Sequence, residues 1–95
     1  ALTLRALRDM RADKLFLSPK AVEDGIYCAS EEEAAVRRAM MDRSGKTFVL
    51  CSANKLGRFA AFQLCSLGEA HAFICDTLPA REWAARLEEA GVLLL

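Results

Sequence analysis

Short apolar runs alternate with polar segments along this chain, and the runs predict the strands of a sheet. Residues 14–18, 46–52 and 71–75 are rich in apolar, β-branched and aromatic residues and are bounded by polar ones. Such runs are typical of strands buried in a parallel sheet. Residues 58–65 and 92–95 predict two further strands on the same grounds.

Helical spacing of apolar residues predicts three helices. The first covers residues 2–11. The second begins at Ser30, because Ser30 and Glu33 match a capping box, in which the serine hydroxyl accepts a backbone N–H and the glutamate reaches back to the cap. The third has Pro79 in its first turn and ends at Gly91, where a glycine suits the C-cap.

The order of these elements predicts an α/β fold. Strand, helix, strand, strand, strand, helix, strand implies a sheet with helices packed on it. We expect the sheet to be open and predominantly parallel, because helical crossovers join parallel strands. Residues 19–30 show no sustained period and contain Pro19 and Gly25, so they predict a loop between the first strand and the next helix.

The net charge and the two ends of the chain limit which functions and which domain organisation are expected. Thirteen basic residues balance 13 acidic ones, so the chain lacks the positive surface that binding to a nucleic-acid backbone requires. We expect residues 1–95 to form a single, partial domain, because the chain opens without Met and ends on three leucines. It contains no membrane span or signal peptide, so we expect a cytoplasmic protein without a membrane partner.

The four cysteines are expected to be free and structural. Cys28, Cys51, Cys65 and Cys75 form no C-x-x-C pair, and the last three lie inside apolar runs. His71 is the only histidine and has no ligand-spaced companion. The sequence therefore predicts neither a metal site nor a bound cofactor.

The main candidate for a binding site is the polar segment 52–58, which follows the strand 46–52. In open α/β sheets, ligands bind beyond the carboxyl ends of the strands. An ammonium, two short polar side chains and backbone N–H groups can converge there, and glycine lets the backbone approach a ligand closely. This chemistry suits a phosphate. The residues concerned are Ser52, Asn54, Lys55, Gly57 and Arg58.

Each candidate also has a purely structural interpretation. Lys55 and Arg58 can be solvated loop charges, which spacing alone favours because no fixed phosphate motif is present. Asp76, at another strand end, either orients a ligand hydroxyl or caps the following helix. Glu33 either binds a hydroxyl or complements the helix dipole, and Gly25 is either a turn residue or part of the same crevice.

Five segments of the chain resemble, in order and spacing, the C-terminal sensor domain of DeoR-type bacterial transcriptional repressors. They are Ala12–Leu17, Asp24–Tyr27, Glu33–Met41, Leu50–Arg58 and Ile74–Asp76. Lys55, Gly57 and Asp76 keep the residues typical of the family. Ser52 stands where the family has Asp, and Cys75 stands where it has Thr.

The resemblance implies a three-layer α/β/α domain, similar to the fold of ribose-phosphate isomerase, glucosamine-phosphate isomerase and CoA transferases. It implies a repressor subunit in a homo-oligomer that senses a phosphorylated sugar. Lys55 would meet the phosphate, and Asp76 or Glu33 would bind hydroxyls. Operator DNA would be bound only by an N-terminal helix-turn-helix domain, which this chain lacks together with the first half of the sensor domain.

Two other functions stay open at this point. One is a fragment of a sugar-phosphate isomerase or CoA-transferase-like enzyme, whose acid/base carboxylate would have to come from Asp76 or from Glu31 to Glu33. The other is a degenerate sensor retained only for oligomerisation, which the substitutions at Ser52 and Cys75 suggest.

Overall fold

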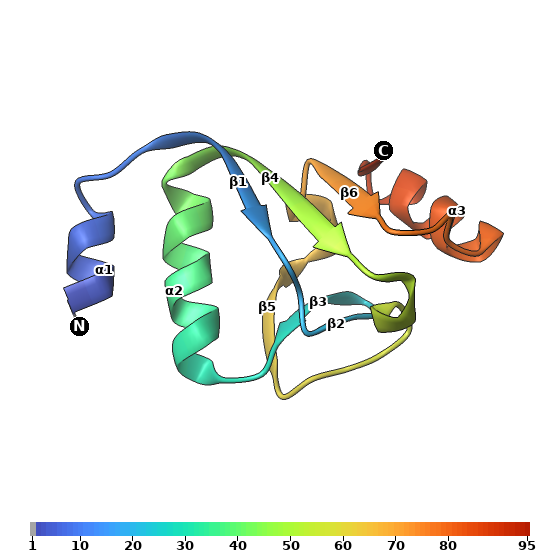
Figure 1. Cartoon of the computed structure of the whole chain (residues 1–95), viewed down its shortest axis with the longest axis horizontal. Helices are drawn as coiled ribbons and strands as arrows, with labels where there is room; N and C mark the ends of the chain where they lie inside the picture. Colours follow the sequence, from blue (N-terminus) through green and yellow to red (C-terminus); the bar gives the residue numbers. More distant parts are fainter. Residues whose placement is uncertain (1) are drawn as a thin grey trace.

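A four-stranded parallel sheet and a smaller antiparallel sheet share one core (Figure 1). This computed structural model describes residues 2–95, and describes side chains from residue 4 onward. Its helices are α1 (Leu2–Leu7), α2 (Glu31–Asp42) and α3 (Arg81–Glu89), with two 3₁₀ turns, η1 (Ala53–Lys55) and η2 (Leu67–Glu69). Its strands are β1 (Ala12–Leu17), β2 (Ala21–Val22), β3 (Gly25–Cys28), β4 (Ser44–Cys51), β5 (Phe62–Ser66), β6 (Ala72–Cys75) and β7 (Leu93–Leu94).

The parallel sheet confirms the predicted α/β class. Its strand order is β1-β4-β6-β7, so the chain moves across the sheet in one direction. Successive right-handed crossovers in one direction place their helices on the same face. Accordingly, one face of the sheet packs with Met41 of α2 and with Trp83 and Leu87 of α3 in a single core. Phe73, which is 0% exposed, lies between Val49 and Leu94 on neighbouring strands.

The other face of the parallel sheet carries apolar side chains that remain open to solvent. Phe16 is 53% exposed and stacks on Phe48 with 5.1 Å between the ring centroids. Leu50 and Leu93, on the same face, are 41% and 52% exposed. Within residues 2–95, the helices therefore cover one face of the sheet and leave much of the other accessible.

The small sheet corrects the expectation of a loop over residues 19–30. Its order is β2-β3-β5, all antiparallel, and Ile26 of β3 pairs with Cys65 of β5. The strand predicted over residues 58–65 is present only from Phe62 onward, as β5, and it belongs to this second sheet. The strands β2 and β3 are too short to show an alternation of apolar and polar residues. Moreover, β3 pairs with β5, which lies far along the chain.

The helix ends largely follow the predicted signals. Ser30 caps α2 by accepting a hydrogen bond from the backbone N–H of Glu33 at 3.1 Å. The Glu33 carboxylate forms an ion pair with Arg37 at 2.8 Å rather than completing the predicted capping box. Gly91 has a φ of +80° just beyond α3, which only glycine adopts without strain. Pro79 lies before the helix, since α3 begins at Arg81.

Candidate functional site

Residues 52–58 follow the carboxyl end of β4, and Ala53–Lys55 within them form the 3₁₀ turn η1. Cys51 of β4 lies opposite Cys75 of β6, so Ser52 and Asp76 follow adjacent strand ends. The Asp76 carboxylate accepts a hydrogen bond from the backbone N–H of Ala53 at 2.9 Å. Asp76 thus fixes the start of η1, and it does not cap α3, whose N-cap is Ala80 without a side-chain bond.

The second half of this segment is attached to β2. The backbone N–H groups of Gly57 and Arg58 both donate to the carbonyl of Val22, at 2.7 and 3.1 Å. Gly57 has a φ of +81°, so a glycine is required for this turn. Because these two N–H groups are already paired, a ligand at this loop would have to be bound mainly by side chains.

Lys55 points from η1 toward the end of β1. It is half-buried, and its Nζ donates to the carbonyl of Pro19 at 3.0 Å. Arg37 binds the neighbouring residue, donating to the carbonyl of Ser18 at 2.7 Å. Two cations therefore hold the chain where it leaves β1. An ammonium carries three N–H donors, so Lys55 retains donors for a ligand while bonded to Pro19.

A hollow of about 250 Å³ lies beside Lys55. It is lined by Lys20, Ala21, Asn54, Lys55, Arg58 and Phe59. None of its three cations belongs to an ion pair within the described part of the chain. The nearby carboxylate of Glu23 is paired with Arg86 at 3.1 Å, so it does not neutralise the hollow. The hollow is accordingly positive and suits an anion.

The structure gathers some of the predicted site residues and separates others. Asn54, Lys55 and Arg58 line the hollow, and Ser52, Gly57 and Asp76 belong to or anchor the same loop. Gly25 is buried in β3, where a Cβ would lie 2.7 Å from the carbonyl oxygen of Cys65. Glu33 is paired with Arg37 at the start of α2. Neither of these last two lines the hollow.

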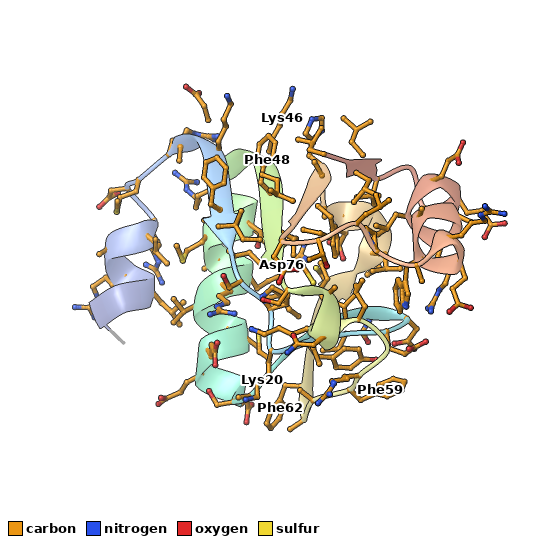
Figure 2. The ribbon with its side chains drawn as sticks, turned by 45° about the vertical axis from the view of Figure 1, so that its right-hand side comes forward. Lys20, Lys46, Phe48, Phe59, Phe62 and Asp76 are labelled. Atoms are coloured by element: carbon orange, nitrogen blue, oxygen red, sulfur yellow. The ribbon has the colours of Figure 1, made fainter. Side chains whose placement is uncertain are left out.

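Three lining residues were absent from the predicted set: Lys20, Ala21 and Phe59. Lys20 follows β1, so the rule that ligands bind beyond strand ends would have found it. Phe59 has no comparable signal, since its position depends on how the loop folds over β2. Figure 2 shows Lys20, Phe59 and Phe62 at one end of the molecule, and Lys46 and Phe48 at the opposite end.

A larger hollow, about 440 Å³, lies at the other end of the parallel strands. Its charged lining comprises two cations, Arg38 and Lys46, and two carboxylates, Asp42 and Glu69. Arg38 forms ion pairs with both carboxylates. A hydrogen bond from the backbone N–H of Ser66 lowers the pKa of Glu69, which keeps that carboxylate charged. Because these charges balance one another, the smaller positive hollow is the better candidate for an anion site.

Gly25→Ala should lower the free energy of unfolding by about 1–3 kcal/mol, because the added methyl group would overlap the carbonyl of Cys65 across the β3–β5 pair. Urea denaturation measures this effect. The folded fraction should keep the ligand affinity of the original chain, since Gly25 lies outside the hollow. A loss of affinity at unchanged stability would instead make Gly25 a ligand contact.

All four cysteines are free, as predicted, and burial raises the pKa of each thiol. The pKa of Cys51 is raised to about 11 and that of Cys65 to about 12. Among residues 2–95, no group of three or more His, Cys, Asp or Glu side chains is placed to hold a metal ion. No helix in that range is long and apolar enough to cross a membrane.

The native thiols should react with a disulfide reagent at about pH 8 at least about ten times more slowly than the thiols of the urea-unfolded chain. A raised pKa leaves little reactive thiolate near neutral pH, and burial limits access to Cys51 and Cys65. The absorbance of the released reagent follows both reactions. A native thiol that reacts as fast as an unfolded one would contradict the structural role of these residues.

Comparison with known proteins identifies relatives for most of this chain. The family model described as the DeoR C terminal sensor domain matches residues 1–77. The HTH-type transcriptional regulator GlpR of Haloferax volcanii is 33% identical over 85 residues, which are 87% of this chain and 33% of that protein. The HTH-type transcriptional repressor GlcR of Bacillus subtilis (strain 168) is 30% identical over 93 residues, 97% of this chain and 36% of that protein. The chain thus spans about a third of the length of these relatives.

Proposed function

Because the chain belongs to the DeoR C-terminal sensor domain family, we propose that it binds a phosphorylated sugar or related metabolite in the hollow beside Lys55. The relatives are transcriptional regulators, so the alternative of an isomerase or CoA-transferase fragment is set aside. In this proposal, ligand binding controls how tightly a separate helix-turn-helix domain holds operator DNA. The chain itself senses the ligand and does not convert it.

The observation that carries this proposal is the cluster of unpaired cations around the hollow. Lys20, Lys55 and Arg58 lie together without a carboxylate partner among the described ion pairs. A phosphate monoester carries a charge close to −2 at neutral pH and has three acceptor oxygens. Lysine would bind it as a compact charge, and the guanidinium of Arg58 can donate two parallel hydrogen bonds. Asn54 adds an amide donor from the same loop.

The position of the hollow offers a route for coupling. The loop that carries Lys55 is bonded to β2 through Val22, to β6 through Asp76 and to the end of β1 through Pro19. A ligand that binds Lys55 therefore contacts a loop that is attached to three strands. The ligand shifts the equilibrium between two conformational states of the protein only by its difference in affinity for them, and coupling free energies of about 1–3 kcal/mol are typical.

The open face of the parallel sheet supports the proposal that residues 1–95 are one part of a larger sensor domain. Phe16, Leu50 and Leu93 expose apolar surface there, and the chain spans about a third of the length of its relatives. We propose that another segment of the full protein covers this face. DNA binding would belong to the helix-turn-helix domain of a cytoplasmic homo-oligomer, in keeping with the net charge of zero on the present chain.

A panel of sugar phosphates titrated against the protein tests the proposal. At a concentration about one hundred times Kd, a true ligand should raise the melting temperature by about 10 °C, because mass action then stabilises the folded state by about 2.7 kcal/mol. Sodium chloride at the same ionic strength is the control for a general salt effect. A broad panel that leaves the melting temperature unchanged would contradict the proposed function.

A further inference from the structure

An exposed aromatic ring stands at the edge of the positive hollow. Phe59 lines the hollow and is 65% exposed. Its ring meets the edge of Tyr27, with 5.4 Å between the ring centroids and 72° between the planes. Tyr27 is itself held in place, because its hydroxyl donates a hydrogen bond to Asp24. The ring of Phe59 is therefore supported from one side and open to solvent on another.

The backbone next to Phe59 is also fixed. Arg58, its neighbour in the chain, donates its backbone N–H to Val22. A few residues later the chain enters β5 at Phe62, which pairs with Cys28 and is 39% exposed. In Figure 2, Phe59 and Phe62 lie at the same end of the molecule as Lys20. The loop thus presents a flat apolar surface beside the cations in a defined position.

A single exposed apolar side chain is normal on a protein surface and needs no explanation. Here, however, the exposed ring shares one hollow with Lys20, Lys55 and Arg58. Aromatic rings interleaved with cations are the arrangement with which proteins bind nucleotides, since the rings stack on bases and the cations meet phosphates. The pairing of these two features in one place points to a ligand with both a negative charge and a flat ring.

We propose that the site prefers a nucleoside monophosphate, with the phosphate among the three cations and the base stacked on Phe59. This inference rests on the proposed function and narrows its ligand class, because a nucleoside monophosphate is a phosphorylated sugar that carries a base. The hollow of about 250 Å³ is small for a complete ligand, so it holds the sugar phosphate. The base extends over the exposed face of Phe59. A sugar ring alone lacks the flat π surface that favours stacking.

Calorimetric titration of the 95-residue chain with adenosine monophosphate, ribose phosphate and adenosine tests this preference. We expect adenosine monophosphate to bind at least about tenfold more tightly than ribose phosphate, because base stacking on an aromatic side chain adds to the affinity. Phe59→Ala should remove that advantage, so that adenosine monophosphate and ribose phosphate bind with similar affinities. Phe59→Trp, which keeps an aromatic surface, should retain the advantage.

Phe16→Ala is the matched control, because Phe16 is a similarly exposed phenylalanine on the open face of the parallel sheet, outside the hollow. It should leave the preference intact. Equal affinities for the two phosphates in the original chain, or an equal loss of both in Phe59→Ala, would overturn the base subsite while the phosphate site stands. If neither phosphate binds, this inference fails, whereas the proposed function fails only if the whole panel of sugar phosphates leaves the melting temperature unchanged.

Discussion

Lys55→Ala should weaken the binding of a sugar phosphate by about 10- to 100-fold. A hydrogen bond to a charged group contributes about 1.5–3 kcal/mol, and Lys55 supplies both such a bond and a full positive charge. Binding should be weakened rather than abolished, because Lys20 and Arg58 remain in the hollow. Isothermal calorimetry with the tightest ligand of the panel measures the change.

Lys46→Ala is the matched control for this experiment. Lys46 is an exposed lysine at the opposite end of the molecule, so its removal lowers the net charge equally without altering the hollow (Figure 2). Its ligand affinity should stay within about twofold of the original, which excludes a general electrostatic effect. An unchanged ligand response in Lys55→Ala would contradict the sensor site and favour the degenerate domain retained for oligomerisation.

Phe73→Ala should lower the free energy of unfolding by about 3–5 kcal/mol. Phe73 is 0% exposed and lies on β6, between β4 and β7 in the parallel sheet, where its loss leaves a cavity in the core. A chain of 95 residues has a total stability of about 5–14 kcal/mol. The substitution therefore removes a large share of the total, and urea denaturation followed by circular dichroism should show it.

Phe16→Ala provides the comparison, since it removes the same side chain from the open face of the sheet. With 53% of Phe16 exposed, the cost should be about 1 kcal/mol or less. A cost as large as that of Phe73→Ala would contradict an open face in the isolated chain, and would mean that another copy covers Phe16 in solution.

Local signals identified most of the parallel sheet and the helix ends. Ser30 caps α2 and Gly91 ends α3 because each depends on only a few neighbouring residues. The runs that form β1, β4 and β6 were found because strands buried in a parallel sheet are apolar throughout. The loop with Lys55 was found for a related reason, since it directly follows such a strand.

Other features could not be predicted from the sequence because they depend on contacts between distant segments. The strands β2 and β3 form by pairing with each other and with β5, so the residues 19–30 contain no local pattern that indicates a strand. Gly25 was expected at the site, yet its neighbour in space is Cys65. Asp76 was expected either to bind a ligand or to cap α3; it does not cap α3, and its bond to Ala53 across the sheet edge depends on how β4 and β6 pair.

The sequence by itself therefore determined the α/β class, the order of the main elements and the loop that carries Lys55, because periodicity, capping and strand composition act over short stretches of chain. Only the tertiary structure decided that Lys20 and Phe59 join Lys55 at one hollow and that the helices leave one face of the sheet open. The hollow depends on the hydrogen bonds that attach the loop after β4 to β2, and the open face depends on the direction and handedness of the crossovers between parallel strands. The physical reason is that both features bring together residues far apart in the chain.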